Sequence, residues 1–115
     1  MKLIDNIAVA TWTHSSYSDV WSIYYGQFEK YAPFFKHYMI VNEHTEAHPF
    51  ERCTQIMNNE NDLYHKRFTE SMAQINEKYV LYMQEDFLLY DNVLKDNIVK
   101  IVDFLENSDH SFVRL

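Results

Sequence analysis

Three side chains with ligand-type oxygens, Gln84, Glu85 and Asp86, directly follow a short apolar run at Tyr79–Met83. Carboxylate and amide oxygens are the ligands that hard divalent cations such as Mg²⁺ and Mn²⁺ prefer. A cation held here could bridge a diphosphate and screen its charge from an acidic protein. The simpler interpretation makes Glu85 and Asp86 solvated residues at a strand end. In a chain with 17 acidic residues, the motif alone favours that simpler interpretation.

Polar side chains also follow the two earlier apolar runs of the chain. Thr11, Thr13 and His14 lie at the end of the first run, and Asn42 and Glu43 lie at the end of the second. In parallel sheets, ligands bind at the carboxyl ends of the strands, where the strand order reverses. These residues are therefore candidates for a common site with the acidic pair. His14 could meet a phosphate or act as a base, although such a histidine more often caps the next helix.

The strands that must position these residues are predicted from apolar runs bounded by polar residues. Asn6–Thr13 is apolar on both alternating faces, which is typical of a strand buried on both sides of a parallel sheet. The other predicted strands are Lys36–Asn42, Cys53–Met57, Tyr79–Met83 and a terminal strand at 111–115.

Three amphipathic helices are predicted between these strands from apolar residues at helical spacing. The first has Ser18 as its N-cap and ends before Pro33. The second runs from Tyr64 to Tyr79, and Asp91 caps the third. The apolar faces comprise Val20, Tyr24 and Phe28; Tyr64, Phe68, Met72 and Ile75; and Leu94, Ile98, Ile101, Val102 and Leu105.

Alternating strands and helices predict a single α/β domain over residues 1–115. Right-handed crossovers place helices on both faces of a mostly parallel sheet. The expected architecture is therefore a Rossmann-like, three-layer α/β/α fold with four to five strands.

Composition excludes several classes of function. The net charge of −7 repels the phosphate backbone of nucleic acids, so neither DNA nor RNA is expected as a partner. The single glycine, Gly26, excludes the glycine-rich phosphate loops of Walker A, Rossmann and sugar nucleotidyltransferase sites. No apolar stretch approaches the roughly 18 residues of a membrane span. Cys53 is the only cysteine, so no intrachain disulfide can form, and we expect a cytoplasmic protein.

Taken together, the strand ends and the acidic motif followed by FLLY resemble the nucleotide-binding half of GT-A-fold glycosyltransferases. In that family the strand-end acids form the DxD motif, so the resemblance implies that Asp86 holds Mn²⁺ or Mg²⁺, with Glu85 beside it. Gln84 stands where many members have a first aspartate. The resemblance also assigns the nucleotide-sugar to a set of residues near the strand ends. That set is Thr11, Thr13, His14, Glu43, Arg67 and Glu85, with Lys66 as a second basic residue near the phosphates.

A GT-A enzyme normally continues with an acceptor site and, in inverting members, a catalytic base, and nothing in this sequence matches either. We therefore expect an N-terminal half without autonomous transfer activity. It could be a fragment, a reduced protein that only binds, or a chain that completes its sheet by oligomerising. A terminal strand at Phe112–Leu115 would favour pairing with another chain.

The main alternative is a small, non-catalytic α/β interaction module whose acidic crevice is incidental and whose aromatic surface contacts a protein partner. Trp12, Trp21, Tyr24 and Phe28 are interpreted as core residues, since aromatic residues at helical spacing usually pack inside. His44 and His48 have a metal-ligand spacing, but we interpret their segment as a solvated loop because no third ligand is near.

Overall fold

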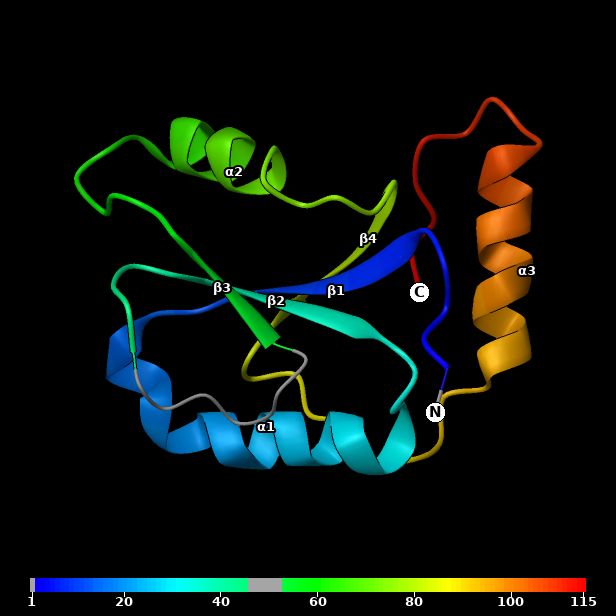
Figure 1. Cartoon of the computed structure of the whole chain (residues 1–115), viewed down its shortest axis with the longest axis horizontal. Coiled ribbons are helices and arrows are strands. Elements are labelled where there is room, and N and C mark those ends of the chain that lie inside the picture. The colour runs from blue at the N-terminus through cyan, green and yellow to red at the C-terminus, as the bar shows by residue number, and fades with distance from the viewer. Residues whose placement is uncertain (1, 46–52) are drawn as a thin grey trace.

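Four parallel strands form one sheet in the computed structural model, which describes residues 2–45 and 53–115. They are β1 (Ile7–Trp12), β2 (Lys36–Val41), β3 (Cys53–Met57) and β4 (Tyr79–Gln84). Their order across the sheet is β3-β2-β1-β4, with every neighbouring pair parallel (Figure 1). The predicted α/β class and the mostly parallel sheet are therefore confirmed.

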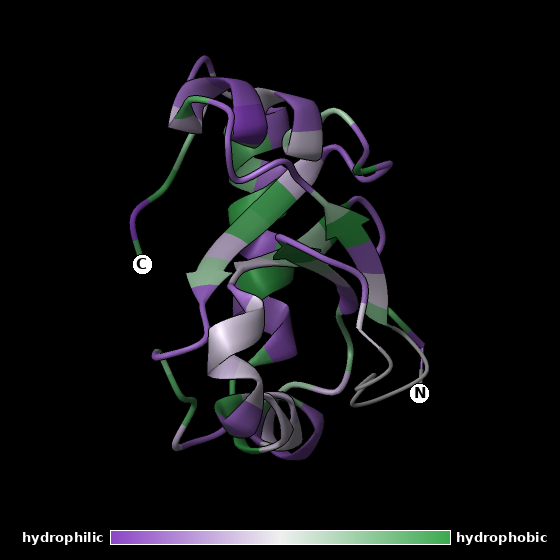
Figure 2. Ribbon diagram, turned by 90° about the vertical axis from the view of Figure 1, so that its left-hand side faces the viewer, coloured by the Kyte–Doolittle hydropathy of each residue, from purple (hydrophilic) through white to green (hydrophobic). Residues whose placement is uncertain are grey.

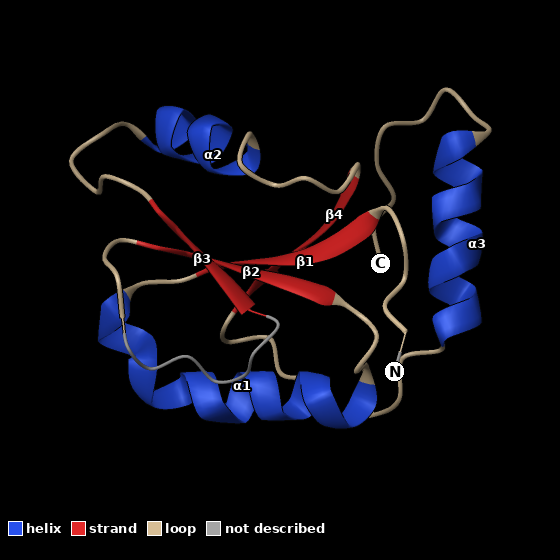
Figure 3. Ribbon diagram, in the orientation of Figure 1, coloured by secondary structure: helices blue, strands red, loops and turns tan. Residues whose placement is uncertain are grey.

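Helices cover both faces of the sheet (Figure 3). A short 3-10 turn, η1 (Ser15–Tyr17), leads into α1 (Ser18–Tyr31), which connects β1 to β2. The helix α2 (Tyr64–Met72) connects β3 to β4 across the opposite face, and α3 (Lys95–Glu106) follows β4. None of these helices, within the residues that the structure describes, has the length and apolar character needed to cross a membrane.

Two apolar clusters hold the layers together, one on each face of the sheet. Successive side chains of β1 point to opposite faces of the sheet and therefore reach both clusters. Ile7 and Val9 belong to the cluster under α1 and α3, while Ala8 and Ala10 belong to the cluster under α2. Figure 2 shows hydrophobic residues running through the strands between more polar helices. Phe28 of α1 lies in the larger cluster with 1% of its surface exposed. β1 is buried on both faces of the sheet, which confirms the prediction made for this strand.

Three predicted boundaries are wrong. The second helix ends at Met72 rather than Tyr79, because the chain must turn through 73–78 to reach the edge of the sheet for β4. Ser18 is the first residue of α1 rather than its N-cap, since the 3-10 turn precedes it. Asp91 does not cap α3: its carboxylate accepts from the backbone N–H of Asn92 at 2.7 Å, and Leu94 occupies the N-cap position.

The terminal strand predicted at 111–115 does not form. Phe112 and Leu115 are apolar, but 77% and 74% of their surface remains exposed to solvent. A strand needs a hydrogen-bonded neighbour, and within the described part of the chain this segment has none. The strand edge expected at Phe112–Leu115 is therefore not formed in this structure.

The thiol of Cys53 should be nearly unreactive in the folded protein. It lies buried at the start of β3, and burial raises its pKa to about 11, so little thiolate exists near neutral pH. We expect alkylation at pH 8 to be slower than in the denatured chain by on the order of a hundredfold. Time-resolved mass spectrometry with iodoacetamide measures this. Equal rates in the folded and guanidine-denatured protein would contradict the buried position of Cys53.

Candidate functional site

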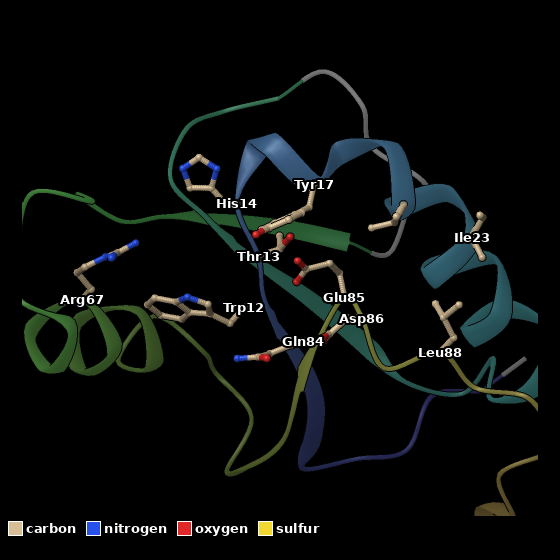
Figure 4. Close-up of a pocket in the computed structure, with 11 residues that line it drawn as sticks. Trp12, Thr13, His14, Tyr17, Ile23, Arg67, Gln84, Glu85, Asp86 and Leu88 are labelled. Carbon is tan, nitrogen blue, oxygen red and sulfur yellow. The ribbon is translucent and has the colours of Figure 1, made fainter.

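A pocket of about 590 Å³ opens at the carboxyl ends of β1 and β4 (Figure 4). The chain winds from β1 to β2 and β3 on one side, then returns to place β4 on the other side of β1. The strand order therefore reverses between β1 and β4, which is where doubly wound sheets bind their ligands. The polar side chains of its lining are Thr13, His14, Tyr17, Arg67, Gln84, Glu85 and Asp86.

The register of the sheet brings the two sets of candidate residues together. Trp12, the last residue of β1, pairs with Gln84, the last residue of β4. The residues that follow each strand therefore emerge side by side at the same edge of the sheet. Figure 4 shows Glu85 beside Thr13, with His14 beyond them. The acidic motif and the polar residues after the first strand thus line the same pocket.

Five of the predicted site residues line the pocket, namely Thr13, His14, Arg67, Glu85 and Asp86. Thr11 lies inside the fold instead: it is fully buried, and its hydroxyl lies 2.8 Å from that of Tyr24. Burial raises the pKa of Tyr24, so its phenol stays protonated for this hydrogen bond.

Glu43 is also placed away from the pocket, exposed to solvent after β2 and outside the lining. His44 is exposed in the same segment, and His48 lies outside the described residues. Thr13 lines the pocket but is almost buried, and its hydroxyl accepts a hydrogen bond from the Trp21 indole at 3.0 Å.

The two acids supply the anionic part of the site. They follow β4 in a tight turn, in which the backbone N–H of Phe87 donates to the Gln84 carbonyl at 3.1 Å. Glu85 is half-buried and Asp86 is exposed. Within residues 2–45 and 53–115, no three His, Cys, Asp or Glu side chains gather as a metal site. The donor set nevertheless fits Mg²⁺ or Mn²⁺ held by one or two carboxylates together with substrate phosphates.

His14 belongs to the loop that shapes the pocket. Its Nε2 lies 2.9 Å from the carboxylate of Glu60, and its Nδ1 accepts from the backbone N–H of Ser16 at 3.1 Å. The second contact caps the 3-10 turn, which is the simpler role considered for this residue. Asn42 holds the same loop from the end of β2, accepting from the Ser15 backbone N–H at 2.8 Å.

Of the two basic residues on α2, only Arg67 belongs to the pocket. Its guanidinium carbon lies 5.3 Å from the centre of the Trp12 ring, within cation–π range. The side chain of Lys66 instead lies 3.5 Å from Asp62 and 4.0 Å from Glu70 along the helix surface. The helical geometry separates the two neighbours, since consecutive residues point in different directions.

No protein-family model matches this chain, and no curated protein or solved structure matches it either. The glycosyltransferase resemblance therefore rests on the quoted residues, and the candidate site rests on its own geometry.

Some residues that line the pocket are not predicted as site residues from the sequence. Trp12 was predicted as core together with Trp21, Tyr24 and Phe28, and the latter three are indeed buried. Trp12 is half-buried: its ring lies against Tyr64 and Phe68 of α2, and it also lines the pocket at the end of β1. Its place at the end of an apolar run could have suggested this. Leu88 and Ile23, which line the pocket near α1, have no comparable signal in the sequence.

Proposed function

We propose that this chain binds a nucleotide-diphospho-sugar, as the nucleotide-binding half of a GT-A-type glycosyltransferase. One observation carries the proposal: Glu85 and Asp86 emerge beside Thr13 and His14 in a pocket at the reversal of strand order. Arg67 lines the same pocket and offers a cation to a phosphate group. Two carboxylates and an arginine in one pocket suit a ligand that carries phosphate groups and binds together with a divalent cation.

In this proposal, each pocket residue has the role in ligand binding that its side-chain chemistry allows. Asp86 and Glu85 would hold Mn²⁺ or Mg²⁺ together with the diphosphate. When bound, the cation supplies charge that stabilises a nucleoside diphosphate as a leaving group. Arg67 would donate hydrogen bonds to phosphate oxygens. Trp12 and Tyr17 provide aromatic surface in the same pocket.

The proposal is binding without autonomous sugar transfer. We assign the carboxylates of Glu85 and Asp86 to the cation, and His14 contacts Glu60 and Ser16. Among the described pocket residues we therefore assign none as the base that would activate an acceptor hydroxyl.

Isothermal titration of UDP and GDP into the purified chain tests this function. With Mn²⁺ present, we expect one nucleotide to bind with micromolar to millimolar affinity, on the order of −4 to −8 kcal/mol. EDTA should remove that binding, because the acidic pocket then repels the diphosphate. If neither nucleotide binds with Mn²⁺ or with EDTA, the proposed function is wrong.

Protein interaction is a second candidate, favoured by apolar residues exposed beside the pocket. Phe87, Leu88, Tyr90 and Leu94 lie in or next to the segment between β4 and α3, and Tyr90 is 88% exposed. Such clusters commonly mark interaction surfaces. Metal dependence separates the candidates, because an interaction module has no need for Mn²⁺-dependent nucleotide binding.

A further inference from the structure

Asn58 connects the end of the sheet to the pocket through three hydrogen bonds. It directly follows β3 and is half-buried. Its backbone N–H and its side-chain Nδ2 both donate to the carbonyl of Val41, the last residue of β2, at 3.0 and 3.1 Å. Its remaining side-chain atom, Oδ1, accepts from Nε of Arg67 at 2.7 Å. Asn58 is therefore anchored to the sheet and holds a pocket residue at the same time.

These contacts determine how Arg67 enters the pocket. Asn58 occupies the Nε–H group, and the Trp12 ring lies beside the guanidinium. The guanidinium is planar and rigid, so fixing one N–H and one face also fixes the direction of its terminal nitrogens. Figure 4 shows the guanidinium of Arg67 extending upward beside Trp12, toward the His14 end of the pocket. The terminal N–H groups are thus presented before any ligand arrives, which lowers the entropy cost of binding.

We propose that Asn58 is a positioning residue for anion recognition: it orients Arg67 so that the terminal N–H groups of the guanidinium meet phosphate oxygens of the ligand. The inference rests on the proposed function for the identity of the ligand, a nucleoside diphosphate. It goes beyond that function by placing a second residue, outside the pocket lining, in control of affinity. A bidentate contact to phosphate depends on the angle of the fork, so a free guanidinium is a poorer ligand than a held one.

A double-mutant cycle tests the inference by titration of UDP and GDP with Mn²⁺. We expect Asn58→Ala and Arg67→Ala each to weaken binding about tenfold, because each loses a hydrogen bond to a charged group. The double variant should bind no more weakly than Arg67→Ala alone, since Asn58 acts only through Arg67. Asn58→Ala with wild-type affinity, or losses that simply add in the double variant, would overturn the inference.

Asn58→Asp separates the positioning role from a structural one. The aspartate keeps an oxygen acceptor for Arg67 but loses the donor to Val41. If Asn58 acts by orienting Arg67, Asn58→Asp should bind within about threefold of Asn59→Asp, which adds the same negative charge at the next residue, while Asn58→Ala loses affinity relative to wild type. Equal losses in both variants would show that the Val41 bond matters instead. Asn59→Ala and Lys66→Ala serve as matched neighbours, because neither residue lines the pocket.

Inorganic pyrophosphate distinguishes failure of this inference from failure of the proposed function. Pyrophosphate with Mn²⁺ presents the phosphate oxygens without a base or a sugar. If UDP and GDP do not bind but pyrophosphate does, and Asn58→Ala weakens it, the nucleotide assignment fails and the role of Asn58 stands. If pyrophosphate binds wild type and Asn58→Ala equally, or if neither pyrophosphate nor a nucleotide binds the wild type, the role of Asn58 is overturned.

Discussion

Replacing Asp86 with asparagine should weaken Mn²⁺-dependent nucleotide binding by more than about a hundredfold while leaving the fold intact. The amide removes the negative charge that a hard cation requires, and among the described residues that line the pocket Glu85 is the only other acid. The fold should be unaffected because Asp86 is exposed in the turn after β4. Titration of UDP and GDP with Mn²⁺ gives the affinity, and thermal unfolding reports the stability.

A charge-matched control variant shows whether the effect of Asp86→Asn is specific to the pocket. Asp109→Asn makes the same chemical change at an exposed residue beyond α3, outside the pocket lining. It lowers the overall negative charge equally, so it corrects for any general weakening of electrostatic repulsion. Equal nucleotide affinity in Asp86→Asn and Asp109→Asn would remove Asp86 from the metal site and leave Glu85 to be tested by Glu85→Gln.

Replacing Phe28 with alanine should lower the free energy of unfolding by about 3–5 kcal/mol. Phe28 is 1% exposed and packs edge-on against Tyr24, Phe35 and His37, with ring centres 5.3, 6.3 and 4.8 Å away. Truncation leaves a cavity between α1 and the sheet that these rings cannot fill. Because domains of this size are stable by only about 5–15 kcal/mol, the loss is a large part of the total. Chemical denaturation followed by circular dichroism measures it.

Phe112→Ala is the control for this substitution. It removes the same side chain from a residue that is 77% exposed, so it should change the free energy of unfolding by less than about 0.5 kcal/mol. A loss comparable to that of Phe28→Ala would mean that residues 111–115 pack against the fold in solution. A small loss at Phe28 would contradict the position of α1 over the sheet.

Most elements of the fold could be predicted because local patterns record burial. Cys53–Met57 is predicted with the bounds that the structure has, and β1, β2 and β4 differ from their predicted bounds by one residue at one or both ends. β1 and β2 are buried on both faces and are therefore apolar along most of their length, and this signal needs no knowledge of the neighbours. The segment 111–115 has a similar composition but forms no strand, since pairing depends on a neighbour that composition does not specify.

The position of the candidate site could be predicted, but not its complete membership. Glu85 and Asp86 follow a strand, and the general rule for parallel sheets places such residues at the ligand crevice. Thr11 and Thr13 look equivalent in sequence, yet the register buries the first under α1 against Tyr24 and brings the second to the pocket. Small differences in position along the chain therefore decide which of the two threonines lines the pocket.

By itself, the sequence determined the class of this protein: an acidic α/β fold with acids at a strand end and no glycine-rich phosphate loop. Only the tertiary structure decided which side chains meet. Trp12 lies far along the chain from Asn58 and Arg67, and the return of β4 to the side of β1 forms the pocket that Trp12 and Arg67 line. The physical reason is that burial follows local pattern, whereas contacts between side chains depend on register and crossover direction, which arise only when the sheet assembles.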